Sequence, residues 1–373
     1  MAKLKLPLPS LHASAETVES LIGLGTLTAD DFALSTAAEK ESFLPAQKSM
    51  GYWQDAWRRL KKNRVSMVSL CVIVVLMVFA FAGPVVLPYK YQEQLRTSLN
   101  LAPMKYSASE QARMAAGEKI FPHVFGTDTF GRDILARVMI GTRVSVTIGL
   151  LAALLVLIIG SVYGAISGFI GGIVDSVMMR IVDIIASIPD VLVVLLLSVT
   201  LKPRINDLVN AVFANAGASP HGFVRILQVL GSSVIAIFIS FALLYWITMA
   251  RVIRGQVLQL KNQEFVTAAR ALGASNGRII RKHLLPNCIG SMIAAACLQI
   301  PSAIFLESFL SFLGVGINAP LTSLGSMCSD ALGGMYTYTY RLIIPAVILL
   351  VLLLCFNLFG DGLRDALDPR LKK

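Results

Sequence analysis

Residues 144–174 read VSVTIGLLAALLVLIIGSVYGAISGFIGGIV, and no charged side chain occurs among them. A helix of about 20 apolar residues crosses the hydrocarbon core of a bilayer, so this stretch predicts a membrane-spanning helix. It ends in a glycine-rich tract that comprises Gly160, Gly164, Gly168, Gly171 and Gly172. Small residues at a spacing of four allow a second helix to approach closely, and we expect such a contact here.

The composition of the whole chain agrees with a membrane protein. Of its 373 residues, 55% are hydrophobic and 15% are charged. One water-soluble core could not enclose so many apolar side chains, which argues against a disordered chain and against a soluble enzyme. The net charge of +11 could suggest nucleic acid as a partner. We expect none, because the cations lie beside long uncharged runs, as they do on the cytoplasmic side of a membrane.

Five further windows are apolar enough to cross a membrane. They cover Ser66–Tyr89, 176–200, Ile226–Ala250, 287–312 and Leu342–Gly360. The cations between Arg58 and Arg64, and those between Arg251 and Lys282, place both of these segments in the cytoplasm. The predicted fold is therefore an all-α membrane protein with about six transmembrane helices and with both termini cytoplasmic.

These assignments divide the chain into five parts. Residues 1–50 form a cytoplasmic extension, 51–90 the first span with its basic flank, 91–140 an external segment, 141–361 the core with a cytoplasmic loop at 251–286, and 362–373 a cytoplasmic tail. Within the core, residues 202–225 and 314–334 are expected to form external loops. The five cysteines show no metal-ligand or paired spacing and are interpreted as small hydrophobic residues.

The third predicted span carries polar side chains. Asp183, Ser187 and Asp190 recur at positions i, i+4 and i+7, which would place them on one face of a continuous helix. Such a face is unfavourable against lipid, so we expect it to look toward protein or water, with Asp183 paired to Arg180. Asp190, Ser187 and, in the fifth span, Glu307 are the candidate pathway or gate residues. The alternative for Glu307 is a hydrated acid near the membrane surface.

The loop at 251–286 contains the sequence EFVTAARALGAS over Glu264–Ser275. Good helix formers continue to Leu272, and Gly273 stands where a helix commonly ends with a left-handed residue. A second helix is expected from Asn276 to Leu285, with a bend before Pro286, because proline disfavours helical geometry in the preceding residue. Such a segment suits a helix-in-groove contact with another protein, although composition alone equally allows an amphipathic interfacial loop.

This loop resembles the EAA loop of ABC importer permeases. The positions that match its pattern are Thr267, Ala268, Ala269, Gly273, His283, Leu285 and Pro286. Thr267 replaces the acidic residue of the pattern and His283 replaces an isoleucine, so Glu264 is the nearby acid that could serve instead. The resemblance implies that an ATPase contacts the following residues: Glu264, Thr267, Ala268, Ala269, Arg270, Gly273, Ala274, Leu285 and Pro286.

Three more stretches are similar to the dipeptide and oligopeptide (DppC/OppC-like) branch of these permeases. They are GTDTFGRD at 126–133, ESFLSFLGVG at 307–316 and GDGLRDALDPRL at 360–371. The resemblance covers about residues 52–371 and implies the type I (MetI-like) importer fold. The candidate external docking residues are Asp128, Arg132 and Asp133. The simpler alternative for them is an interfacial helix with internal ion pairs.

The resemblance also implies the partners. No GxxxxGK[ST] sequence occurs, so the chain lacks the loop that cradles nucleotide phosphates. ATP and magnesium are therefore expected on two partner ATPases, with no cofactor, metal or catalytic residue in this chain. A second homologous permease would complete the pathway, and an external binding protein would deliver a peptide. The expected location is the lipid of a bacterial inner membrane.

Other functions stay open at this point. Relatives of the same branch import nickel or other small solutes, which would keep the fold and change the cargo. A secondary transporter working alone would instead show an inverted internal repeat with broken helices, and no such repeat is found. An intramembrane enzyme lacks support, since no HExxH motif or paired catalytic aspartate occurs in the spans.

Overall fold

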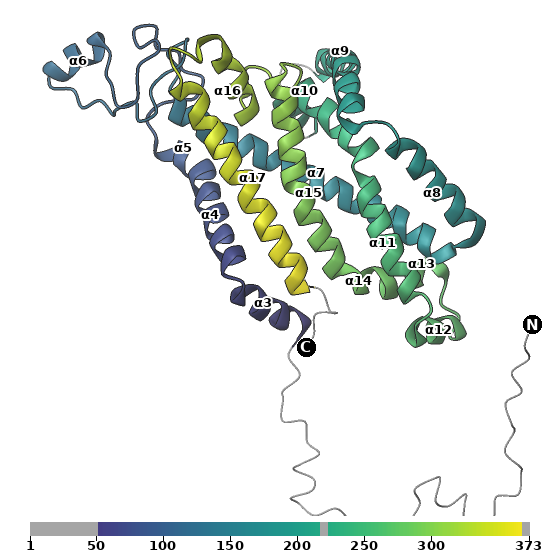
Figure 1. Cartoon of the computed structure of the whole chain (residues 1–373). Helices are drawn as coiled ribbons and strands as arrows, with labels where there is room; N and C mark the ends of the chain where they lie inside the picture. Colours follow the sequence, from purple (N-terminus) through teal and green to yellow (C-terminus); the bar gives the residue numbers. More distant parts are fainter. Residues whose placement is uncertain (1–50, 217–222, 368–373) are drawn as a thin grey trace, which may run out of the picture. The chain divides into compact units, whose positions relative to one another are not determined.

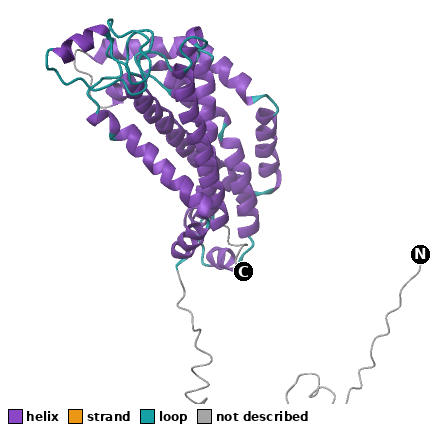
Figure 2. Cartoon of the chain, turned by 60° about the vertical axis from the view of Figure 1, so that its left-hand side comes forward, coloured by secondary structure: helices purple, strands orange, loops and turns teal. Residues whose placement is uncertain are grey.

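A computed structural model describes residues 51–216 and 223–367, and these residues are mostly helical (Figure 1, Figure 2). The elements that carry the argument are α3 (Tyr52–Lys62), α4 (Arg64–Phe81), α5 (Gly83–Val86), α6 (Ala108–Ala115), α7 (Ile134–Ile170), α8 (Gly172–Ala186), α9 (Asp190–Ala216), α10 (Phe223–Leu244), α11 (Trp246–Leu260), α12 (Glu264–Ala271), α13 (Asn276–Ile279), α14 (Leu285–Asn287), α15 (Ile289–Phe312), α16 (Leu324–Ala331) and α17 (Tyr340–Leu367). Within the described ranges there is no β-strand. The expected extension over residues 1–50 lies outside the described residues.

Within residues 51–216 and 223–367, five helices are long and apolar enough to span a membrane. They are Arg64–Val86, Ile134–Ile170, Gly231–Leu260, Ile289–Phe312 and Tyr340–Leu367. A sixth span results if the bent pair Gly172–Ala186 and Asp190–Ala211 counts as one. The prediction of an all-α membrane protein with about six spans is confirmed.

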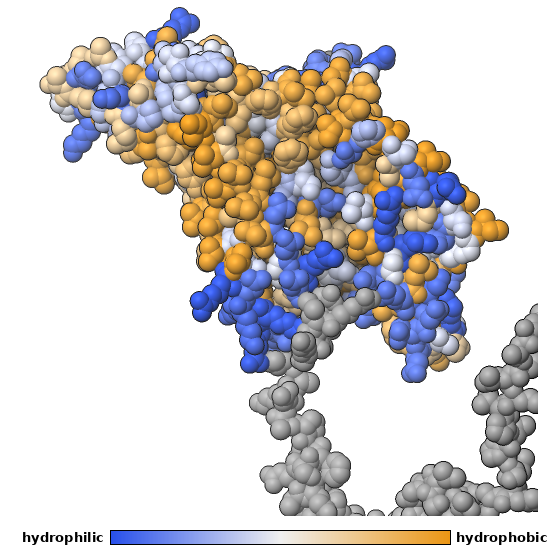
Figure 3. All heavy atoms as spheres, in the orientation of Figure 1, coloured by the Kyte–Doolittle hydropathy of each residue, from blue (hydrophilic) through white to orange (hydrophobic). Residues whose placement is uncertain are grey.

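The exposed apolar side chains form a surface suited to lipid. Figure 3 shows a wide hydrophobic band over the helices, with hydrophilic residues gathered near α3 and α12. Large exposed side chains on α8 and α9 include Ile173, Ile184, Leu192 and Leu196. Monomeric soluble proteins rarely expose so large a contiguous apolar surface, whereas the acyl chains of a bilayer cover it.

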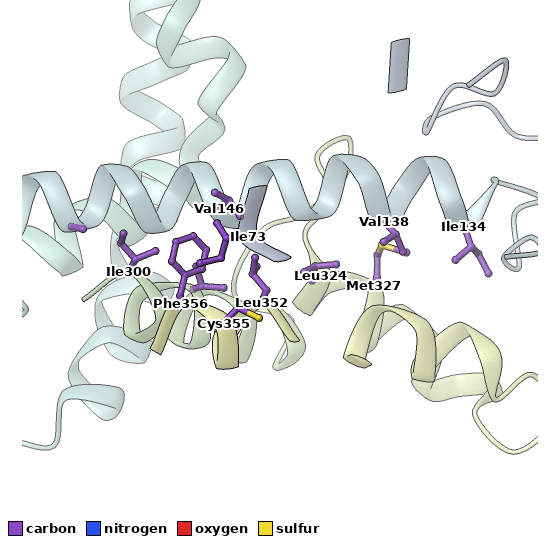
Figure 4. Packing of buried hydrophobic residues seen from close by; sticks show 12 residues of the cluster. Ile73, Ile134, Val138, Val146, Ile300, Leu324, Met327, Leu352, Cys355 and Phe356 are labelled. Carbon is purple, nitrogen blue, oxygen red and sulfur yellow. The ribbon is translucent and has the colours of Figure 1, made fainter. Parts of the chain in front are cut away.

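The long helix α7 organises the bundle. Helices α4, α11 and α15 all pack along it, and Figure 4 shows the buried side chains that gather on one side of it. Val138 and Val146 of α7 share one cluster with Ile300 of α15, Met327 of α16 and Phe356 of α17. Because lipid tails are as apolar as these side chains, close packing rather than removal from water stabilises the cluster.

The glycine-rich tract of α7 makes a close contact with α11. A Cβ added at Gly160 would stand 2.7 Å from the backbone oxygen of Trp246. Gly164 faces the backbone of Ala250 in the same way, and Gly168 faces Arg254. A side chain at any of these positions would push the two helices apart. The glycine contact expected from the sequence is therefore confirmed, with α11 as the second helix.

The third predicted span is broken, and the prediction of a continuous helix was wrong. Helix α8 ends at Ala186, α9 begins at Asp190, and the two are bent by 78°. Pro189 explains the break, because it disfavours helical geometry in the preceding residue and cannot donate a backbone hydrogen bond. Asp183 and Asp190 therefore do not share one face of a continuous helix.

Helices are also longer than the sequence suggested. Residues 202–216 continue α9 instead of forming a loop, since Pro203 removes only one backbone donor from a stretch of otherwise adequate helix formers. Arg251 and Arg254 lie on α11 rather than in the basic loop. Residues 324–331, expected in a loop, form α16, whose first turn is capped by Ser323. The C-terminal helix continues to Leu367, into the expected tail, and residues 368–373 lie outside the described residues.

The segment before α7 is built around His123, which sequence reasoning did not single out. The side chain is 0% exposed, with Nδ1 2.7 Å from Asp133 Oδ2 and Nε2 3.1 Å from Glu110 Oε1. Tyr89 stacks on the imidazole ring. Asp133 also caps α7, because its Oδ1 accepts from the backbone N–H of Ala136 at 2.8 Å. This cap starts the second span at Ile134, inside the expected external segment 91–140.

The two carboxylates determine the charge of this cluster. Burial alone would lower the pKa of His123, but hydrogen bonds to Asp133 and Glu110 outweigh it and raise the pKa above its ordinary value. For Glu110, burial alone would raise the pKa, but hydrogen bonds from the Ser107 backbone and from His123 outweigh it and lower the pKa. The cluster therefore favours an imidazolium beside carboxylates.

We expect Gly164→Leu to destabilise the protein by about 1–3 kcal/mol, because the added side chain would collide with the α11 backbone. The measurement is the thermal unfolding midpoint of the purified protein in detergent. Gly255→Leu on α11 is the matched control, since a Cβ at Gly255 meets nothing within 4 Å. An equal effect of both variants would contradict the close contact.

We expect the segment before α7 to be best protected at mildly acidic pH. The His123 imidazolium stabilises the folded segment fully below the unfolded pKa of 6.5. This stabilisation is lost as the pH rises through the raised folded pKa of His123. The Glu110 carboxylate stabilises the folded segment fully above its unfolded pKa of 4.5. This stabilisation is lost as the pH falls through the lowered folded pKa of Glu110. Amide hydrogen exchange of residues 91–133, corrected for intrinsic rates, should accelerate on the alkaline side. His123→Gln should abolish this dependence, and unchanged protection in the wild type from about pH 6 to 9 would refute it.

Candidate coupling loop and translocation groove

The segment after α11 forms the short helix and glycine cap that the sequence predicted. Helix α12 covers Glu264–Ala271, and Gly273 follows with φ +77°, a left-handed conformation that glycine adopts without strain. The N–H of Gly273 donates to the Arg270 carbonyl at 2.9 Å, and that of Ala274 to the Ala269 carbonyl at 3.0 Å. These bonds close the helix end and fix the direction of the chain that follows.

One side of α12 is fixed to the bundle and the other is exposed. Val266 and Ala269 are buried in a cluster with Ile253 of α11 and with Ile279 and Leu284 of the following segment. The outward positions are Glu264, Thr267, Ala268, Arg270 and Leu272. Leu272 is 88% exposed, which is unusual for a leucine next to a helix end. An outward apolar side chain at this place is typical of a protein contact surface.

The connection from α12 to the fifth span differs from the prediction at Pro286. Leu285 is helical (φ −57°, ψ −42°), although a proline follows it, so no bend occurs there. A π-helical turn over Ile280–Leu284 precedes α14, and Pro286 lies in the first turn of α14, where its missing N–H is least costly. The irregular residue is Cys288 (φ −91°, ψ −1°), between α14 and α15.

The break between α8 and α9 borders a groove of about 780 Å³. Its polar lining residues are Ser187, Asp190, Tyr245, Thr248, Arg251, Gln299, Ser302 and Asn357. They come from the α8–α9 corner, α11 and its N-terminal flank, α15 and α17. Two of the three predicted pathway residues, Ser187 and Asp190, therefore lie together on this groove. These side chains can form hydrogen bonds with water or with a polar solute.

The acids around the groove have different partners from those predicted. Asp183 does not pair with Arg180; its Oδ1 lies 2.9 Å from Arg251 Nη2, and this pair joins α8 to α11. Asp190 Oδ2 accepts from the hydroxyl of Tyr245 at 3.2 Å. The bend between α8 and α9 explains the difference, because it redirects Asp190 while Asp183 stays beside α11.

Glu307 lies away from the groove. Its side chain is 0% exposed, so the alternative of a hydrated acid near the membrane surface is wrong. Its carboxylate accepts from Ser145 of α7 at 2.8 Å and from Ser311 at 2.8 Å, with Ser308 at 3.3 Å. Three hydroxyl donors satisfy an acid that lipid would not tolerate, and the bond from Ser145 ties α15 to α7.

The candidate docking residues belong to a network of ion pairs within the chain. Asp128 Oδ2 is 2.7 Å from both Arg132 Nε and Arg137 Nη1. Arg137 also reaches Asp330 of α16 at 2.8 Å, and Asp133 serves as the cap and histidine partner described above. Asp128 and Asp133 are buried, as the alternative of internal ion pairs requires, although these residues lie in a loop rather than in an interfacial helix.

Sequence reasoning missed three features of these sites. Arg137 and Asp330 are 193 positions apart, so no local pattern joins them. The exposure of Leu272 depends on the orientation of α12, which only its packing determines. Arg251, placed in a loop by its charge, could have been found on α11 from the helix-forming sequence that continues past it. Among the described residues, no group of three or more His, Cys, Asp or Glu side chains could hold a metal ion.

Comparisons with known proteins identify the family of the chain. The family described as "Binding-protein-dependent transport system inner membrane component" matches residues 160–373, and "N-terminal TM domain of oligopeptide transport permease C" matches residues 51–103. The chain is 40% identical over 343 residues to the dipeptide transport system permease protein DppC of Bacillus subtilis, covering 92% of this chain and 93% of that protein. It is 40% identical over 318 residues to the oligopeptide transport system permease protein OppC of Escherichia coli K12, covering 85% and 91%.

A solved structure is similar over a smaller part. A chain from inward-facing conformations of the MetNI methionine ABC transporter aligns with 63% of this chain and 96% of its own length, with a TM-score of 0.44 and 18% identity. The assignment depends instead on the sequence matches, which extend over most of the chain. By these matches, the chain belongs to the family of binding-protein-dependent transport system inner membrane components, with the dipeptide and oligopeptide permeases among its relatives.

Proposed function

We propose that this chain is the permease subunit of an ABC importer for dipeptides or oligopeptides, forming half of the translocation pathway. The relatives named as dipeptide and oligopeptide permeases support the cargo class. One observation supports the coupling role: the exposed helix α12 is joined directly along the chain to helices that border the groove. Helix α11, with Tyr245 before it, borders the groove and leads into α12. The chain after α12 leads into α15, which also borders the groove.

In this proposal, movement of α12 changes the groove through two helices at once. ATP binding closes two partner ATPases, which hold the outward side of α12 around Leu272. Val266 and Ala269 fix the inward side of α12 to α11 and to the segment before α15. A displacement of α12 is therefore transmitted to both walls of the groove, and the irregular residue Cys288 is the place where α15 can change its angle.

The rest of the assembly follows from the same proposal. ATP and Mg²⁺ bind to the ATPases and not to this chain, which performs no chemistry of its own. A second homologous permease faces the groove and completes the path. An external binding protein supplies the peptide at the end that carries α6 and α16, and both termini are cytoplasmic, in a bacterial inner membrane. The cations Arg278, Arg281 and Lys282 beside α12 support this orientation.

We expect an affinity-tagged full-length chain to purify with two ATPase subunits and a second permease. After reconstitution with the external binding protein, the complex should import a radiolabelled dipeptide only when ATP is present. Transport by the isolated chain without ATP would contradict the proposal and identify a secondary transporter. A complex that imports a metal ion but no peptide would contradict the cargo class alone.

We expect Leu272→Asp to weaken ATPase docking by about tenfold or more, because an aspartate would place a charge in an apolar contact. The measurement is the amount of ATPase that remains bound to the purified membrane subunits at increasing dilution. The matched control is Leu332→Asp, at an exposed leucine directly after α16. Helix α16 lies at the opposite end of the bundle from α12 (Figure 1). Retention of the ATPases by Leu272→Asp as strongly as by the control would show that α12 is not the docking site.

A further inference from the structure

The groove interrupts the hydrophobic surface with a polar lining. Figure 3 shows hydrophilic residues at mid-height between apolar helices, on the face where α8, α11, α15 and α17 are seen in Figure 1. Most of the polar residues in this lining are neutral hydrogen-bonding side chains, among them Thr248, Gln299, Ser302 and Asn357. Such groups can donate to carbonyl oxygens and accept from amide N–H groups. They suit a solute with a peptide backbone and do not select its side chains.

The charges at the groove do not balance. Among the described residues that line it, Arg251 is the only lysine or arginine. Its guanidinium is already paired with Asp183 at 2.9 Å. Asp183 and Asp190 together carry two negative charges against the single positive charge of Arg251. One negative charge is left over, and it belongs to Asp190.

Asp190 has donors but no cation. Its Oδ2 accepts from the Tyr245 hydroxyl at 3.2 Å, and its Oδ1 accepts from the backbone N–H of Val191 at 2.9 Å. In the described part of the chain, no lysine, arginine or histidine forms an ion pair with it. A carboxylate can accept more than these two hydrogen bonds. Asp190 is exposed on the groove, so a solute there can reach its carboxylate. An acid without a cation in a membrane-spanning segment commonly meets a charged partner.

We propose that Asp190 receives the protonated amino group of a peptide as it passes through the groove. This inference rests on the proposed function and adds the contact that recognises the substrate inside the membrane. A single carboxylate with one phenolic donor is a poor site for a divalent metal, which needs several ligands. A primary ammonium needs only one such anion and has three N–H donors. The contact is modest in strength, as a site on a path must be, because the peptide has to leave again.

The test uses the complete transporter in proteoliposomes with its external binding protein and ATP. Asp190→Asn should lower the rate of dipeptide import about tenfold, because a charge-assisted hydrogen bond is lost. Binding of the dipeptide to the external protein and the ATPase activity that it stimulates should stay the same, so more ATP is consumed per peptide. Asp190→Glu should keep most of the import. Asp207→Asn, the same exchange on the exposed surface of α9, is the control and should behave like the wild type.

The outcomes separate this inference from the proposed function. A wild-type complex that imports no peptide would remove the basis of both. In a second outcome, the wild-type complex imports dipeptides, and Asp190→Asn has the same import rate and the same ATP consumption per peptide as Asp207→Asn. That result would overturn only the role of Asp190. A loss of import in Asp190→Glu as complete as in Asp190→Asn would also overturn it, since the charge would then not be the property that matters.

A second measurement does not depend on transport. Ser187→Cys places a thiol on the groove near Asp190, and its reaction with a cationic and an anionic methanethiosulfonate reagent is compared after subtracting the reaction of the parent protein. The carboxylate of Asp190 should favour the cationic reagent several-fold, and Asp190→Asn should remove that preference. The ratio of the cationic to the anionic reaction rate is compared between the protein with Asp190 and the Asp190→Asn variant. If this ratio is the same in both, the groove does not attract cations through Asp190, and the inference is contradicted.

Discussion

The close contact between α7 and α11 is the constraint on which the rest of the structure depends. Three glycines at a spacing of four let the two backbones meet without side chains between them. At one end of this contact, Lys261 donates to the Gly168 carbonyl of α7 at 2.9 Å. Beside it, Arg254 of α11 binds Asp175 of α8 with two hydrogen bonds of 2.6 Å. Because lipid offers no hydrophobic driving force for helix association, this fit determines where α11 lies.

The position of α11 in turn joins the two functional regions. At one end, Tyr245 precedes the helix and meets Asp190, and further along Arg251 meets Asp183, so α11 supplies polar partners to both sides of the α8–α9 corner. At the other end it continues into α12, whose inward side packs against Ile253. A rigid helix between a contact surface and a groove transmits displacement without requiring any intermediate to unfold, which suits a subunit driven by movement of its partners.

Much of this was predictable from the sequence, and the exceptions have identifiable physical causes. Uncharged windows, the glycine spacing and the cap at Gly273 are local signals, and the structure contains the corresponding spans, helix contact and helix end. The break at Pro189 was overlooked because apolar residues are frequent on both sides of it, so that the whole stretch resembles one span. The pairs Asp183–Arg251, Glu307–Ser145 and Arg137–Asp330 were out of reach, because the two members of each pair lie far apart in the sequence and are brought together by packing.

The central claim is that movement at α12 changes the groove. Electron paramagnetic resonance can measure it directly, with spin labels on cysteines introduced at Ser187 and Ser302, two groove residues on different walls. The distance between the labels is compared in the complete transporter without nucleotide and with trapped ATP. The account predicts that the distribution of distances shifts between the two states. An identical distribution in both states, with the ATPases demonstrably closed, would contradict it.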